Sequence, residues 1–191
     1  MNFENVLLEN CREIIESWEE NDIYAISFLL HSEPTAKVGE VENFPEFSVG
    51  YNTESFCENA PKISEERWNY AFWIQNNISV ISAENDNMAQ QLIEWYQVNG
   101  VENLGKILED EYDEDFNYIG KGPCGYYELL MQISQVAKTL QTDGTIRSKF
   151  GEIPIIVHDL EYSWFSKTAT IEANPNGEAV DFIKTYEELF V

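Results

Sequence analysis

The stretch from Asp22 to His31, DIYAISFLLH, most constrains the fold, because its large apolar residues recur at every second position. The recurring residues are Tyr24, Ile26, Phe28 and Leu30. This period is typical of a β-strand that places one face on an apolar core. Residues 47–51 have the composition of a second strand that pairs with it, across a loop over residues 33–45.

The segment before this strand has a different period. Its apolar residues recur at spacings of three, four and seven, and they are Phe3, Val6, Leu7, Ile14, Ile15 and Trp18. Glutamates such as Glu9 and Glu13 occupy the opposite side. This pattern predicts an amphipathic N-terminal helix over residues 3–20, which packing of its apolar stripe has to stabilise.

Further elements follow along the chain. We expect helices over residues 85–97, 126–140 and 175–189 and a buried strand over residues 153–158. The last helix would have Asn174 as its N-cap and Pro175 at its first position. The aromatic residues of 64–75 are too dense to separate helix from strand. The sequence therefore predicts one α+β domain over residues 1–191, a mainly antiparallel sheet packed against several helices.

The net charge of −24 restricts the possible partners. Of the 35 acids, 25 lie in residues 1–119, together with only 5 of the 11 Lys and Arg residues. Like charge repels nucleic-acid phosphates and anionic membranes, so neither is expected as a partner. A basic protein remains as a partner, and a solubilising role for the charge is the alternative. The apolar content of 43% excludes a disordered chain.

Residues 109–118, EDEYDEDFNY, form the most acidic segment. Its acids are Glu109, Asp110, Glu111, Asp113, Glu114 and Asp115, and Tyr112 and Phe116 stand among them. Aromatic anchors within a charged rim are typical of protein-binding surfaces. A calcium loop is excluded, because a start at Asp113 or Asp110 puts Tyr118 or Asp115 where the turn needs glycine. The segment is a candidate partner-binding site or a solvated run.

A second candidate is a polar site after the buried strand. His158, Asp159 and Glu161 follow that strand, and His31 ends another one. Such residues can run acid–base chemistry, but a histidine that hydrogen-bonds the next turn is the simpler interpretation. No catalytic motif is present, and Cys124 is interpreted as a structural thiol. We expect no metal and no cofactor.

The compartment follows from three sequence features. The N-terminus has acids where a signal peptide needs basic residues, and no stretch of 18 apolar residues occurs. Cys11, Cys57 and Cys124 are odd in number and contain no C-x-x-C pair, which favours free thiols. A cytoplasmic protein is expected.

Several short motifs resemble a bacterial family. They are YNTES (51–55), ERWNYAFW (66–73), DGTIRSKFG (143–151), IPIIVHDLEYSW (153–164) and TIEANPNG (170–177). Together they resemble domain-of-unknown-function family 4303, over roughly residues 20–177. The resemblance implies an α+β domain and supplies no activity, cofactor or catalytic residue.

These observations predict a non-enzymatic, cytoplasmic, acidic binding protein. Its expected partner is a basic protein, a toxin or nuclease, which it would inhibit as an immunity or antitoxin-type protein. The analogy is that small acidic bacterial domains of this type resemble immunity proteins, which neutralise secreted toxins. The alternative is a small ligand-binding or hydrolase domain centred on His158, Asp159 and Glu161.

Overall fold

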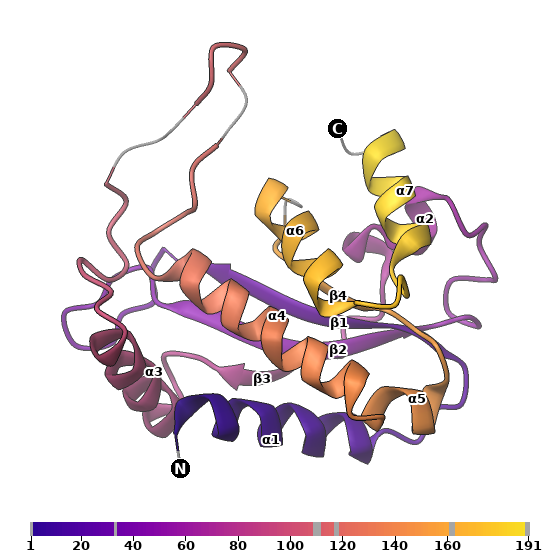
Figure 1. Cartoon of the computed structure of the whole chain (residues 1–191), viewed down its shortest axis with the longest axis horizontal. Coiled ribbons are helices and arrows are strands. Elements are labelled where there is room, and N and C mark those ends of the chain that lie inside the picture. The colour runs from indigo at the N-terminus through magenta and orange to yellow at the C-terminus, as the bar shows by residue number, and fades with distance from the viewer. Residues whose placement is uncertain (1, 33, 109–111, 117–118, 161–162, 190–191) are drawn as a thin grey trace.

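The computed structural model describes residues 2–32, 34–108, 112–116, 119–160 and 163–189. These residues form one α+β domain, as predicted (Figure 1). The strands are β1 (Ile23–Ser32), β2 (Pro45–Thr53), β3 (Ile78–Ile81) and β4 (Ile155–His158). The helices are α1 (Phe3–Ser17), α2 (Glu65–Trp68), α3 (Asp86–Val98), α4 (Tyr126–Thr142), α5 (Thr145–Phe150), α6 (Trp164–Ala173) and α7 (Val180–Leu189), with a 3₁₀ turn η1 (Tyr70–Phe72).

The sheet is mixed, with the strand order β3-β2-β1-β4. Two of its pairings, β1 with β2 and β2 with β3, are antiparallel. The third, between β1 and β4, is parallel, so the sheet is not purely antiparallel. Parallel neighbours need a crossover connection, and here more than half of the chain runs between the two strands. In this strand order β4 lies at an edge of the sheet, and it is nevertheless buried along its whole length.

β1 is buried on both faces, which the alternating pattern did not predict. Ile26, Phe28 and Leu30 face the larger core as expected. Tyr24 does not share their face, because the register shifts between Ile23 and Ala25 and the ring joins a second core. A bulge of this kind reverses the direction of a side chain while the strand continues.

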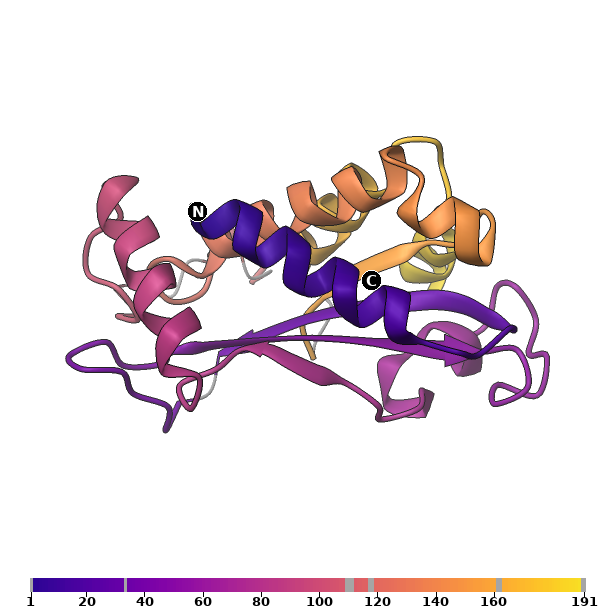
Figure 2. The same cartoon turned by 90° about the horizontal axis from the view of Figure 1, so that it is seen from below.

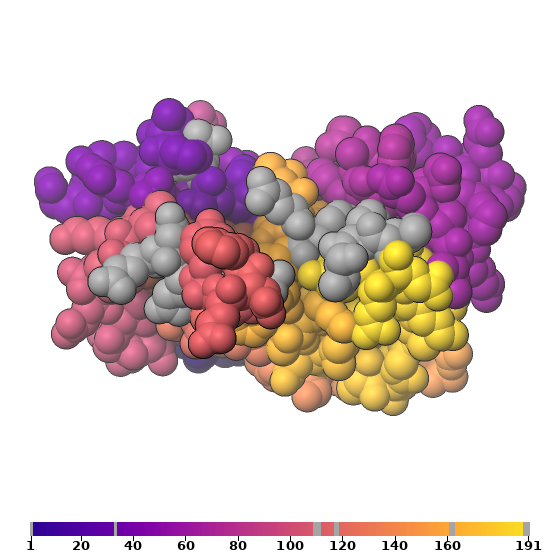
Figure 3. Space-filling view, turned by 90° about the horizontal axis from the view of Figure 1, so that it is seen from above, coloured from indigo at the N-terminus to yellow at the C-terminus, as the bar shows by residue number. Residues whose placement is uncertain are grey.

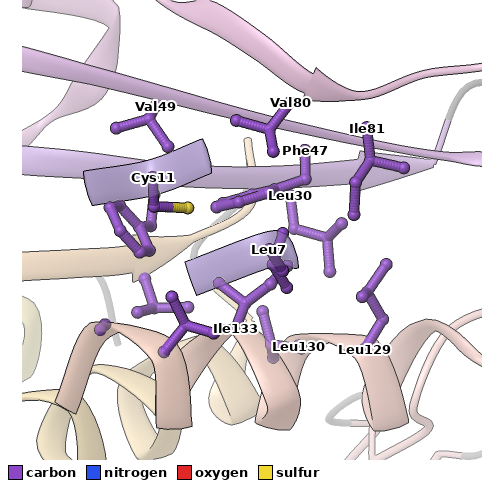
Figure 4. Packing of buried hydrophobic residues seen from close by; sticks show 14 of the residues in the cluster. Leu7, Cys11, Leu30, Phe47, Val49, Val80, Ile81, Leu129, Leu130 and Ile133 are labelled. Carbon is purple, nitrogen blue, oxygen red and sulfur yellow. The ribbon is translucent and has the colours of Figure 1, made fainter. Parts of the chain in front are cut away.

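The larger core lies between one face of the sheet and the helices α1 and α4, which Figure 2 shows on the same side of the strands. Figure 4 shows Leu7 and Cys11 of α1 between strand side chains and α4. The residues predicted to face inward on α4 are all buried: Leu129, Leu130, Ile133, Val136, Ala137 and Leu140. Burying this much apolar surface is what holds the acidic helix α1 on the domain.

A smaller core covers the other face of the sheet. It contains Tyr24, Trp68, Trp73 and Phe182, which come from β1, α2, the end of η1 and α7. Figure 2 shows the short α2–η1 segment on the opposite side of the sheet from α1. The undecided aromatic segment is therefore mostly core, formed by two short helical turns rather than by one element.

Two of the motifs that carry the family resemblance meet beside this smaller core. Glu54 of YNTES accepts hydrogen bonds from both terminal nitrogens of Arg67 of ERWNYAFW, at 2.8 and 2.5 Å. The Arg67 guanidinium carbon also lies 3.9 Å from the centroid of the Tyr24 ring. This pairing lowers the pKa of the Glu54 carboxyl. These motif residues have a structural role.

The N-terminal helix is shorter than predicted. α1 ends at Ser17, where residues 3–20 were expected to be helical, because Trp18 has an extended backbone with ψ 140°. Its ring packs on Tyr51 at 4.7 Å between centroids. Glu19 and Glu20 would also place negative charge at the negative end of the helix dipole.

The C-terminal helix begins later than predicted. Asn174 is the C-cap of α6 rather than the N-cap of a helix over residues 175–189, and α7 begins at Val180. The Asn174 side chain is not available to cap a following helix because it binds the backbone of β4. Pro175 follows the end of a helix, where proline is common. α6 itself and the short α5 and β3 were not predicted.

Candidate functional site

The described part of the predicted acidic segment, residues 112–116, lies on an arm that projects from the body (Figure 1). The arm comprises the described residues between 107 and 123. The arm is closed at its base, where Gly105 N donates to Cys124 O at 2.9 Å and Cys124 N donates to Lys106 O at 3.0 Å. Asn43 Nδ2 donates to Gly105 O at 2.7 Å and ties this base to the loop between β1 and β2. The base is thus held by backbone bonds, independently of the residues further out.

The second half of the arm is attached to the helices. Trp164 Nε1 of α6 donates to Gly120 O at 3.1 Å. Lys121 Nζ lies 4.5 Å from the centroid of the Tyr127 ring of α4, a cation–π distance. These contacts set the direction in which the arm leaves the body.

The described part of the tip is a tight turn around Phe116. Asp113 Oδ1 accepts from Asp115 N at 2.9 Å, and Phe116 N donates to Asp113 O at 3.1 Å. Phe116 has φ +62°, a conformation that side chains other than glycine rarely adopt. Its side chain is 86% exposed, so the turn presents the ring to solvent. In Figure 3, which looks onto this face, the coral atoms of residues 112–116 lie at the surface.

The structure places part of the predicted acidic set. Tyr112, Asp113, Glu114, Asp115 and Phe116 are all exposed on the arm. Glu109, Asp110 and Glu111 lie outside the described residues. The prediction missed the exposed apolar residues of the arm, which are Ile107, Leu108 and Ile119. The sequence contained the information needed to predict them, because these apolar residues flank the acidic run directly. A run that is only solvated does not need apolar neighbours.

Three residues of the predicted polar site, His158, His31 and Asp159, lie among the described residues, and each makes contacts of its own. His158 is 1% exposed and lies on β4 with its ring against Tyr70, 4.9 Å between centroids. His31 lies on the neighbouring strand, and its Nε2 is 3.7 Å from Glu46 Oε2. Asp159 accepts from the backbone nitrogen of Ser163 at 3.2 Å and from its hydroxyl, at the start of α6. Glu161 lies outside the described residues.

Both ring nitrogens of His158 are engaged. Nδ1 is 2.9 Å from the backbone oxygen of Asp159, which can only accept, so this nitrogen carries the proton. Nε2, 2.8 Å from Ser27 Oγ, is then the acceptor of the Ser27 hydroxyl. Burial lowers the pKa of His158 to about 4, although the bond to Asp159 acts in the opposite direction. The histidine is therefore a neutral, buried hydrogen-bonding group at pH 7.

Within the described residues, no group of three or more His, Cys, Asp and Glu side chains could hold a metal ion. Cys11, Cys57 and Cys124 are free thiols, and Cys124 belongs to the base of the arm. None of the described helices has the length and apolar character needed to cross a membrane.

Comparisons with protein-family models, with curated proteins and with solved structures find no match to this chain. The resemblance to family 4303 stays a prediction. The arm, with its exposed aromatic and apolar side chains among acids, is the candidate site that the geometry supports best.

Proposed function

We propose that this chain is a binding protein that docks a basic protein through its arm, residues 107–123. The observation that carries the proposal is Phe116, a large apolar side chain that is 86% exposed in a left-handed turn directly after three acids. Exposing such a ring, in a conformation that costs about 1 kcal/mol or more, is unfavourable for the isolated chain. A partner that covers the ring would offset this cost.

The described arm combines two kinds of group that binding surfaces use. Tyr112, Phe116 and the apolar residues beside the acidic run provide contact area. Asp113, Glu114 and Asp115 provide negative charge, which speeds the approach of a basic surface and excludes acidic ones. Most apolar residues elsewhere in the domain are buried in its two cores, so the arm can bind without disturbing them.

The negative charge of the arm favours one class of partner. A nuclease, or another toxin that acts on nucleic acid, has a basic groove that holds phosphates. Carboxylates on a projecting arm would occupy such a groove in place of the phosphates and block it. The proposed function is accordingly that of an immunity or antitoxin-type inhibitor, which would act in the cytoplasm.

The alternative, a hydrolase or ligand-binding site at His158, has one supporting observation. Ser27 and His158 form a hydrogen-bonded pair of the type that activates a serine nucleophile. Both residues are buried, however, and the ring is covered by Tyr70 and Trp73. A substrate would reach the hydroxyl only if this aromatic layer moved, so the pair supports the fold better than it supports catalysis.

Capture from an extract of the native cells tests the proposal. The baits are the wild-type chain, Phe116→Asn, and a variant in which Asn-Gly replaces the arm between Lys106 and Cys124. Asparagine tolerates the left-handed turn, and Asn-Gly suits a two-residue connection, so both variants should keep the fold. Circular dichroism and thermal unfolding check that they do.

We expect the wild-type chain to retain one basic protein in stoichiometric amount, both at low salt and at about 0.15 M salt. Both variants should lose it. Equal retention by all three baits would contradict a role for the arm. Capture of only a broad, salt-labile set of basic proteins would show that the net charge acts as an ion exchanger.

A further inference from the structure

A polar cavity of about 270 Å³ lies at the far end of α4 from the arm. It is bounded by the last turn of α4, by α5 with the turn that follows it, and by the connection between α6 and α7. Its lining residues are Gln141, Arg147, Gly151, Glu152, Asn176, Gly177 and Glu178. The size suits a small molecule or a single functional group rather than a large cofactor.

Gln141 lines this cavity with a side chain that is only 8% exposed. Its Nε2 donates to Ile153 O and to Asn174 Oδ1, both at 2.9 Å. Both amide hydrogens are therefore committed, and this fixes which end of the amide is the oxygen. Among the described residues Gln141 Oε1 has no hydrogen-bond donor. An accessible acceptor on a nearly buried side chain is thus left for a group that enters the cavity.

The charged residues of the cavity are held in place by their own contacts. Glu178 accepts from the backbone nitrogen of Asn176 at 3.1 Å and from its side-chain amide at 2.9 Å. Arg147 Nη2 is 2.7 Å from Glu152 Oε1, so these two charges offset each other at the rim. The remaining charge is that of Glu178. The cavity consequently combines a solvent-accessible amide oxygen, on an otherwise nearly buried side chain, with one net negative charge.

We propose that this cavity binds the primary ammonium group of a small amine. An ammonium has three N–H donors and no acceptor, which matches an amide oxygen and a carboxylate that both accept. Its positive charge is favoured by Glu178, and a charge-assisted hydrogen bond is stronger than a neutral one. A hydroxyl compound would gain no charge, and an anion would be repelled. This proposal is independent of the arm and its partner.

Titration of the full chain with putrescine, followed by NMR in 0.1 M potassium chloride, tests the proposal. The side-chain amide signals of Gln141 report directly on the cavity. We expect them to shift in a saturable manner with putrescine. We expect no such shift with 1,4-butanediol, which lacks the charge, or with tetramethylammonium, which has the charge but no N–H donor.

Matched charge variants separate the cavity from the general negative charge of the protein. Glu178→Gln should weaken putrescine binding at least about fivefold, since it replaces a charge-assisted bond by a neutral one. Glu187→Gln makes the same change in net charge on α7, at a residue that does not line the cavity, and should leave the affinity within about twofold. Equal weakening by the two variants, equal shifts with tetramethylammonium, or no saturable shift of the Gln141 signals would overturn the proposal.

Discussion

Asn174 binds both main-chain polar groups of Ile155: its Nδ2 donates to Ile155 O at 2.7 Å and its Oδ1 accepts from Ile155 N at 3.0 Å. Thr170, one turn earlier on α6, repeats the arrangement on Val157, with its Oγ1 2.9 Å from the oxygen and 3.0 Å from the nitrogen. The two side chains occupy the place of a neighbouring strand along the open edge of β4. They satisfy backbone groups that would otherwise be buried without partners or exposed to another chain.

We predict that Asn174→Ala lowers the free energy of unfolding by about 3 kcal/mol, because it leaves a buried N–H and C=O unpaired. Asn176→Ala, two residues along on the exposed turn, should change it by less than about 0.5 kcal/mol. Urea unfolding of both variants measures the difference. Equal losses would show that the contact with β4 is unimportant.

From the packing at the base of the arm, we predict that two glycines differ in how much stability is lost when each is replaced by alanine. Gly105 and Gly100 have nearly the same backbone, with φ +72° and +70°. A Cβ on Gly105 would lie 1.6 Å from the backbone oxygen of Glu42, whereas one on Gly100 would meet nothing within 4 Å.

Gly100→Ala should therefore cost about 1 kcal/mol of stability, from the left-handed conformation alone. Gly105→Ala should cost at least about twice as much and should disturb the base of the arm. Denaturant unfolding and amide hydrogen exchange at Lys106 and Cys124 test this. Similar values for the two variants would contradict the close packing of Gly105 on Glu42.

His158 predicts a dependence of stability on pH. Its pKa is about 4 in the folded chain and near the ordinary 6.5 in the unfolded chain. The unfolded chain therefore takes up the proton first as the pH falls. The stabilisation is complete above pH 6.5 and is lost between pH 6.5 and 4, with a loss of about 2 kcal/mol between pH 7 and 5.

His158→Gln, which carries no titrating group, should remove this part of the pH dependence while lowering stability at pH 7. The comparison is the difference between the two unfolding curves at pH 5, 6 and 7, because carboxylates contribute to both chains alike. Parallel pH profiles would mean that His158 does not titrate as a buried group.

The residues that pack the core were the most predictable from sequence. The six inward residues of α4 recur at helical spacing, and apolar side chains with this spacing are stabilised by burial in the core. α6 was missed because it is buried on more than one side: Phe165 and Ala169 face the larger core, and Thr170 faces β4. Such a helix lacks the apolar–polar contrast on which the prediction depends.

The errors at Tyr24 and Asn174 have a different origin. Both residues fit the predicted local pattern, and tertiary contacts determine what they do. A register shift turns Tyr24 toward Trp68 and Trp73, and Asn174 binds the backbone of β4. In the same way, the sequence indicated the acids around Phe116 but not the closed base that makes them part of an arm.

The association rate between the chain and the basic protein that it captures tests the central claim most directly. It should be measured by stopped flow from low to about 0.15 M salt. One variant carries Asp113→Asn, Glu114→Gln and Asp115→Asn on the arm. The matched control carries Glu13→Gln, Glu16→Gln and Glu19→Gln at exposed positions on and after α1.

The two variants have the same net charge, so any difference between them reports on the position of the charge. We predict that the arm variant associates about threefold or more slowly at low salt and with a weaker salt dependence, and that the control stays close to the wild type. Equal rates for the arm variant and its control would contradict the claim that the arm directs binding.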